Sequence, residues 1–120
     1  MPGKRILLVE DDPDVQDLVA MLLREAGYVV DTASTVANAM TLLDGTAYVL
    51  AIVDWRLADG DGLLVADSAA AMGAKTILMS GKLSRMPGGR AEGHDTIMKP
   101  FEPDEFLEAV RAAIGETDDA

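Results

Sequence analysis

The sequence predicts an α/β fold, in which a doubly wound parallel sheet of five strands carries helices on both faces. Short apolar runs alternate with amphipathic stretches along the 120 residues, and this alternation is typical of parallel sheets with right-handed crossovers. The third run, residues 48–53, reads YVLAIV and indicates a strand buried on both faces. A central strand there gives the expected strand order 2-1-3-4-5.

The first half of the chain contains two strand-helix pairs. Residues 4–9 form the first expected strand, and Asp12-Pro13 supplies the next helix with an N-cap and a proline at its first position. Five apolar residues at helical spacing are expected on its buried face, namely Val15, Leu18, Val19, Leu22 and Leu23. Residues 28–33 form the second strand, after which Ser34 or Thr35 caps a helix that ends at Gly45.

The second half continues the rhythm with one interruption. A helix over residues 62–72 and a strand over 75–79 follow the central strand. Residues 80–93 then contain four glycines and one proline, so the fourth helix is expected to be degenerate. A short strand over 95–98 precedes a last helix that opens at Glu102-Pro103 and closes at Gly115.

Composition narrows the classes of function. The length predicts one domain over residues 1–120, with a core of about residues 4–115. A formal charge of −11 disfavours binding to nucleic acid or membranes and favours partners with basic surfaces. The absence of cysteine excludes disulfides and thiolate metal sites. No apolar stretch approaches the roughly 18 residues of a membrane span, and a cytoplasmic protein is expected.

Polar and charged side chains follow four of the expected strands. Glu10 and Asp11 follow the first strand, Asp54 the third, Ser80 the fourth and Lys99 the fifth. Strands one and three are neighbours in the expected order, so the three acids should converge in one crevice. Such carboxylates repel one another unless a cation neutralises them, and oxygen ligands suit Mg²⁺ or Mn²⁺. A lysine and a serine there can hold a phosphoryl oxygen.

Each group alone has an ordinary structural explanation. Acids favour the N-terminus of a helix because of its dipole, most lysines are solvated, and serine is common in turns. Their coincidence at the ends of alternating strands favours a functional site.

The chain resembles the receiver domain of bacterial two-component response regulators, in the flavodoxin-like class of folds. The resemblance spans the whole length, through ILLVEDDP, VDWRLADGDGL, ILMSG and MKPF. Spacing agrees with these motifs, because Asp54 lies 43 residues after Asp11 and 45 residues before Lys99. The resemblance implies that Asp54 accepts a phosphoryl group from a histidine kinase or a histidine phosphotransfer protein.

The resemblance also assigns the other site residues. Asp11, Asp54 and the backbone carbonyl of Arg56 would bind Mg²⁺, while Glu10 would help through water. Ser80 would be the family's Ser/Thr switch and Lys99 its lysine. Such a domain catalyses only its own phosphorylation and dephosphorylation, and its altered surface would be recognised by a downstream protein target. The oligomeric state stays open between monomer and weak dimer.

Three features depart from the family pattern: Ala58, Thr96 and a shortened, broken helix between the fourth and fifth strands. All but Ala58 fall on the surface that many receivers use to dimerise or to dock their output. Ala58 replaces the usual proline after Leu57, so the loop after Asp54 is expected to be less rigid. Thr96 stands where the family commonly has Tyr or Phe. The composition of residues 81–93 predicts that phosphorylation orders this segment instead of rotating an aromatic ring.

Other functions fit the residues less well. A hydrolase of the haloacid dehalogenase type needs a second aspartate where Arg56 stands, and an FMN carrier needs a Ser/Thr/Gly-rich loop where Glu10 and Asp11 stand. A pseudo-receiver that binds a partner without phosphorylation remains the alternative, although this chain retains the acids and the lysine. The initiator Met and the acidic ending favour a stand-alone receiver over a piece of a larger regulator.

Overall fold

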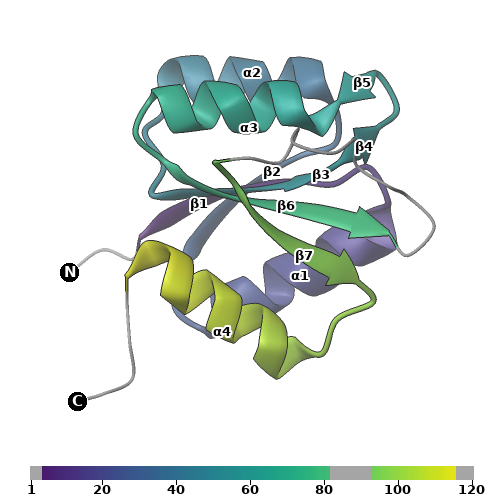
Figure 1. Ribbon diagram of the computed structural model, residues 1–120, viewed down its shortest axis with the longest axis vertical. Coiled ribbons are helices and arrows are strands. Elements are labelled where there is room, and N and C mark those ends of the chain that lie inside the picture. Colours follow the sequence, from purple (N-terminus) through teal and green to yellow (C-terminus); the bar gives the residue numbers. More distant parts are fainter. Residues whose placement is uncertain (1–3, 82–92, 116–120) are drawn as a thin grey trace.

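The computed structural model describes residues 4–81 and 93–115. One parallel sheet of five strands has the order β2-β1-β3-β6-β7 (Figure 1). Its strands are β1 (Arg5–Val9), β2 (Val29–Ala33), β3 (Leu50–Asp54), β6 (Lys75–Gly81) and β7 (Asp95–Lys99). The doubly wound α/β fold and its predicted strand order are therefore confirmed.

Helices cover the sheet on both sides, α2 and α3 on one face and α1 and α4 on the other (Figure 1). They are α1 (Pro13–Glu25), α2 (Val36–Gly45), α3 (Gly62–Ala71) and α4 (Pro103–Ile114). Each face has its own cluster of buried apolar side chains. All five residues of β3 are buried between these two clusters, as expected for the central strand of a parallel sheet.

The helix ends follow the signals in the sequence. Asp12 caps α1, since its side chain accepts the N–H groups of Asp14 and Val15. Thr35 caps α2 through a 3.0 Å bond from the N–H of Asn38. Helix α4 ends at Gly115, whose φ of 89° suits glycine.

Two predictions about buried positions are wrong. Leu18 is 50% exposed, and Ala20 is buried in its place. The buried residues of α1 are Val19, Leu23 and Ala20. At about 100° per residue their arc is centred near Leu23, and Leu18 lies on the opposite side of the helix. Val49 is also exposed; it lies one residue before β3, which begins at Leu50.

A short hairpin follows β3 where the sequence indicated only a turn. Strands β4 (Arg56–Leu57) and β5 (Gly60–Asp61) pair antiparallel, with Arg56 opposite Asp61. Strands of two residues are too short to give an alternating pattern, so this hairpin could not be predicted. It lies directly between the central strand and α3.

Some expectations fall outside the described residues. The degenerate fourth helix, and the ordering of residues 81–93 on phosphorylation, concern residues 82–92 almost entirely. Among the helices of residues 4–81 and 93–115, none has the length and apolar character needed to cross a membrane.

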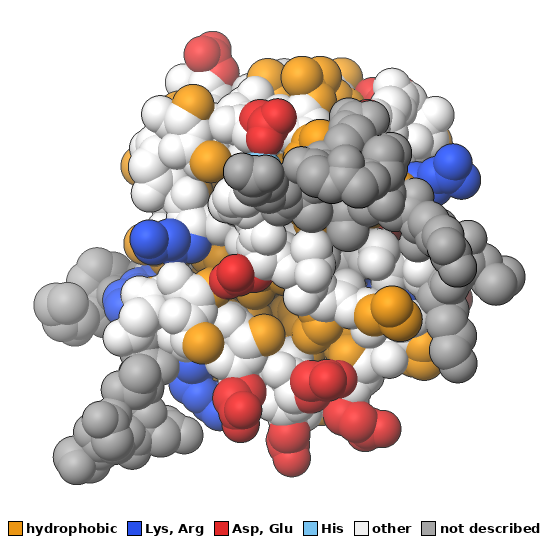
Figure 2. All heavy atoms as spheres, viewed as in Figure 1, with side chains coloured by type: hydrophobic (Ala, Val, Ile, Leu, Met, Phe, Trp, Pro, Cys, Tyr) orange, Lys and Arg blue, Asp and Glu red, His pale blue; other side chains and the backbone are white. Residues whose placement is uncertain are grey.

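Acidic side chains gather over the N-terminal half of α4 (Figure 2). Asp104 and Glu105 lie in the first turn of this helix and are exposed. Negative charge there is favoured by the helix dipole.

Candidate functional site

The register of the sheet brings the predicted site residues to one edge. Val9 pairs with Val53, so Glu10 and Asp11 leave β1 level with Asp54 at the end of β3. On the other side, Asp54 is opposite Met79. Ser80 follows Met79, and Lys99 is opposite Gly81. All of these side chains lie at the carboxyl edge of the sheet, where doubly wound folds place their ligands.

Three carboxylates form a cluster at this edge. One oxygen each from Glu10, Asp11 and Asp54 lies within 4.8 Å of the other two. Glu10 is 1% exposed and Asp54 8% exposed, whereas Asp11 is exposed. The cluster therefore has two buried members and opens to solvent at Asp11.

The ammonium group of Lys99 closes the buried side of the cluster. Lys99 Nζ donates to Glu10 Oε1 at 2.6 Å and lies 3.3 Å from Asp54 Oδ2. A charge-assisted bond of this length between largely buried groups fixes the lysine beside both carboxylates.

The electrostatic balance shifts the pKa values of this pair. Burial raises the pKa of Glu10, and the neighbouring Asp54 adds to this, while the Lys99 ammonium opposes them. For Lys99 burial acts downward, but the combined effect of Glu10 and Asp54 is larger and the pKa is raised. Lys99 is therefore charged at neutral pH.

A residue that the sequence analysis did not single out holds Glu10 in place. Gln16 Nε2 donates to the Glu10 carbonyl at 2.9 Å and to the Ala33 carbonyl at 3.2 Å. The Glu10 N–H donates to the same Ala33 carbonyl. Gln16 lies inside the buried arc of α1, so a polar residue within that apolar pattern was the available signal.

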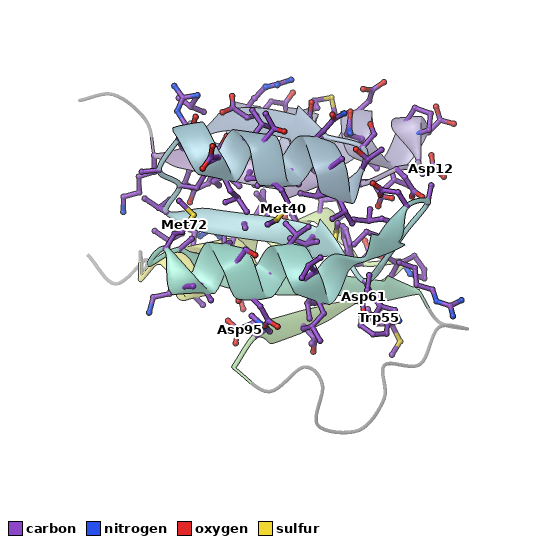
Figure 3. All side chains as sticks on the ribbon, turned by 90° about the horizontal axis from the view of Figure 1, so that it is seen from above. Asp12, Met40, Trp55, Asp61, Met72 and Asp95 are labelled. Carbon is purple, nitrogen blue, oxygen red and sulfur yellow. The ribbon has the colours of Figure 1, made fainter. Side chains whose placement is uncertain are left out.

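A hollow of ≈ 470 Å³ adjoins the carboxylates. It is lined by Asp11 and by residues that follow Asp54: Trp55, Arg56, Leu57, Ala58, Gly60 and Asp61. Figure 3 shows Asp12, Trp55 and Asp61 toward one end of the molecule and Met72 toward the other. The hollow opens Asp11 to solvent.

The donor set fits a hard divalent cation. Three carboxylates face a single ammonium, which leaves negative charge in the cluster. Carboxylate and carbonyl oxygens are the ligands that Mg²⁺ prefers, and Mn²⁺ accepts the same set. Arg56, whose backbone carbonyl the sequence analysis assigned to the metal, lines the hollow beside Asp11.

Ser80 is also buried at this edge, with 8% of its surface exposed. Its position one residue beyond Met79, the partner of Asp54, places it on the strand next to Asp54. The structure thus brings Glu10, Asp54 and Lys99 into contact, with Asp11 in the same carboxylate cluster and Ser80 nearby on β6.

The fold and the site define a doubly wound α/β domain with an acidic carboxyl edge, and comparison identifies its family. Residues 6–111 match the response regulator receiver domain. The chain belongs to this family of two-component systems.

Curated relatives agree over this region. The chain is 36% identical over 116 residues to the response regulator RppA of Synechocystis, covering 90% of this chain and 49% of that protein. It is 33% identical over 115 residues to the transcriptional regulatory protein TcrA of Mycobacterium tuberculosis, covering 92% and 46%. The chain spans about half the length of these relatives.

Solved structures agree in fold. A CheY-like receiver domain protein of Methanospirillum hungatei superposes with a TM-score of 0.87 at 30% identity, covering 95% of both chains. The response regulator TrrA of Thermotoga maritima, solved in complex with Mg²⁺ and BeF, gives a TM-score of 0.83 at 30% identity, covering 92% of this chain and 98% of that one.

Proposed function

We propose that the protein is a phospho-accepting receiver in a two-component phosphorelay, with Asp54 as the acceptor. The observation that carries this proposal is the setting of Asp54. A carboxylate 8% exposed lies 3.3 Å from an ammonium and shares a cluster with two further acids. One positively charged partner is enough for a carboxylate with a purely structural role. Here three carboxylates share a single ammonium, and the excess negative charge suits the binding of a cation.

The transfer uses groups already fixed at the site. A carboxylate oxygen of Asp54 attacks the phosphorus, the bond from phosphorus to the donor's imidazole nitrogen breaks, and the imidazole leaves with the bonding electron pair. Lys99 stands beside Asp54 and offsets the negative charge of the transferring oxygens. Mg²⁺ held by Asp11, Asp54 and the Arg56 carbonyl would supply the remaining positive charge.

Glu10 and Ser80 have supporting parts in this proposal. Glu10 holds Lys99 through the 2.6 Å bond and would reach the cation through water. Ser80 would donate a hydrogen bond to the phosphoryl oxygen and so carry the signal along β6.

The partners we propose are proteins. Receivers take their phosphoryl group from a histidine kinase or a histidine phosphotransfer protein. The similar structure of TrrA was solved with Mg²⁺ and BeF. The formal charge of −11 favours a downstream protein target with a basic surface over nucleic acid. No membrane insertion is proposed, and a cytoplasmic location follows from the same pathway.

Intact-mass spectrometry tests the acceptor. Treatment with acetyl phosphate and Mg²⁺ should add one phosphoryl group to the wild-type protein and none to Asp54→Asn. Asp61→Asn is the matched control, since Asp61 lines the same hollow and caps α3, a role that asparagine also fills. It should gain the same mass as the wild type.

The same experiment distinguishes a phospho-accepting receiver from the alternative, a pseudo-receiver that binds a partner without phosphorylation. A pseudo-receiver would gain no mass even with Mg²⁺ present. Phosphorylation of Asp54→Asn would contradict the choice of acceptor, and an unmodified wild type would contradict the proposal as a whole.

A further inference from the structure

Asp59 joins the hairpin after Asp54 to a helix that lies far from it in the sequence. This exposed residue is in the turn between β4 and β5. Its Oδ1 accepts the N–H of Val36 at 2.7 Å, and its Oδ2 accepts the N–H of Ala37 at 3.2 Å. These two groups open α2, 23 and 22 residues earlier in the chain.

The bonds complete the capping of α2. The first N–H groups of a helix have no partner within it. Thr35 takes the N–H of Asn38, and Asp59 takes those of Val36 and Ala37. The pKa of Asp59 is lowered, first by the bond from Val36, so the residue is a carboxylate at neutral pH and is favoured by the helix dipole.

The hairpin is attached to α2 by packing as well. Gly60 has a φ of +157°, and a Cβ built there would be 3.4 Å from Val36 Cγ2. Leu57 is buried in the cluster against which Val36 packs. The tip of the hairpin therefore rests on the first turn of α2.

The base of the hairpin is attached to the sheet. The Trp55 N–H donates to the Met79 carbonyl at 2.7 Å, and the Gly62 N–H donates to the Trp55 carbonyl at 2.8 Å. Arg56 lies between base and tip. Its backbone is therefore restrained by the sheet on one side and by Asp59 on the other.

We propose that Asp59 is a positioning residue for the metal site, which acts by holding the Arg56 carbonyl in place. The inference rests on the proposed function, because it needs Arg56 to face the cation. It also changes the expectation that Ala58 makes this loop less rigid. Where the family's proline would stiffen this loop, the chain has Ala58, and Asp59 supplies the restraint through α2.

The expected effect is on metal affinity. When the carbonyl is already ordered, binding a cation requires little loss of conformational entropy. A loose hairpin must lose that entropy on binding, which weakens the affinity. Asp59→Ala should therefore raise the Mg²⁺ concentration at half-saturation, with the rate of phosphorylation by acetyl phosphate recovering at saturating Mg²⁺.

Thr35→Ala is the matched control, because it also removes a cap from α2 but leaves the hairpin attached. Fluorescence of Trp55, the single tryptophan, follows the Mg²⁺ titration. Asp59→Ala should weaken binding about tenfold, which is the lower end of the range for the loss of a group that supports a metal ligand. Thr35→Ala should change it less than about twofold. Asp59→Asn keeps one acceptor oxygen and should give an intermediate value.

Two further measurements separate the effect of a displaced hairpin from the effect of the Asp59 charge, and show the displacement without metal. In about 0.5 M KCl the field of an exposed carboxylate is screened, so a loss of affinity that persists there comes from position. In metal-free protein, the amide of Gly62 should exchange faster with solvent in Asp59→Ala than in Thr35→Ala.

The outcomes distinguish the inference from the function on which it rests. Wild-type protein that binds Mg²⁺ while Asp59→Ala binds it equally well would overturn the inference alone. Equal weakening by Thr35→Ala, or a loss that disappears at high salt, would also overturn it. A wild type that binds no Mg²⁺ would overturn both proposals.

Discussion

Lys99 Nζ lies 2.6 Å from Glu10 Oε1, although 89 residues separate the two in the chain. The carboxylate is 1% exposed, so each charge depends on the other for compensation. This bond joins the ends of β1 and β7 across the site and keeps the lysine beside Asp54.

Removal of the lysine should therefore cost stability. In Lys99→Met the buried Glu10 loses its partner, and the free energy of unfolding in EDTA should fall by about 2 to 4 kcal/mol. Glu10→Gln should lower the free energy of unfolding by less, because Lys99 keeps Asp54 as an ion-pair partner. The double variant should recover about 1 kcal/mol or more relative to the sum of the two changes. Urea unfolding measures all four proteins, and additive effects would contradict the coupling.

Metal binding should distinguish two adjacent acids. Asp11 belongs to the carboxylate cluster, whereas Asp12 caps α1. Asp11→Asn should weaken Mg²⁺ binding more than about tenfold, as loss of a ligand requires. Asp12→Asn removes the same charge but keeps a capping side chain, and should change the affinity much less. Trp55 fluorescence follows both titrations, and equal losses would assign the effect to net charge alone.

Tyr48 gives a prediction about alkaline stability. Its hydroxyl donates to Asp31 Oδ2 at 2.8 Å, and burial, followed by this bond, raises its pKa from 10.0 to about 12. Between these values the unfolded chain loses the phenolic proton while the folded protein keeps it. The stabilisation is therefore complete below pH 10 and is lost as the pH rises toward 12.

The absorbance of tyrosinate measures this pKa, in a Tyr28→Phe background that leaves Tyr48 as the single tyrosine. Asp31→Asn should move the transition down toward 10.0. Urea midpoints across the same range should fall more steeply in this background than after Tyr48→Phe is added. An unchanged transition in Asp31→Asn would mean that burial alone sets the pKa.

Much of the site could be predicted because its residues end buried strands. Apolar runs such as the one before Asp54 mark the central strands of a parallel sheet, and the order of winding then brings Glu10 and Asp11 to Asp54. The contact of Lys99 with Glu10 follows the same geometry, since both residues lie at the carboxyl edge.

The supports of the site could not be predicted in the same way. The bonds from Asp59 to α2 join residues that are 22 or more positions apart, and no local pattern relates a turn carboxylate to a particular helix. Leu18 lies at the edge of the apolar face that periodicity defines, yet it is exposed, because packing decides which side of the helix is turned toward the sheet.

Gly62 packs closely against the backbone of the proposed acceptor. A Cβ built at this position would lie 1.9 Å from the backbone oxygen of Asp54 and 3.0 Å from Val53 Cγ1. Neither atom belongs to a flexible chain end, so an alanine here must displace the end of β3 or the start of α3 by about 1 Å. Shifts of that size at a reacting group can cost about a hundredfold in rate.

We therefore expect Gly62→Ala to be phosphorylated by acetyl phosphate at least about tenfold more slowly than the wild type, even at saturating Mg²⁺. Gly45→Ala is the matched control, because a Cβ there meets nothing within 4 Å; it should keep the wild-type rate and gain about 0.5 kcal/mol of stability. Circular dichroism and urea unfolding establish the folded fraction of each variant, and rates are compared per folded molecule. Additional Mg²⁺ should restore the rate of Asp59→Ala, in which only the hairpin is loosened. It should not restore the rate of Gly62→Ala, in which the acceptor itself is displaced. A wild-type rate in folded Gly62→Ala would show that the Asp54 backbone tolerates the shift, and its close approach to Gly62 would then be a matter of packing alone.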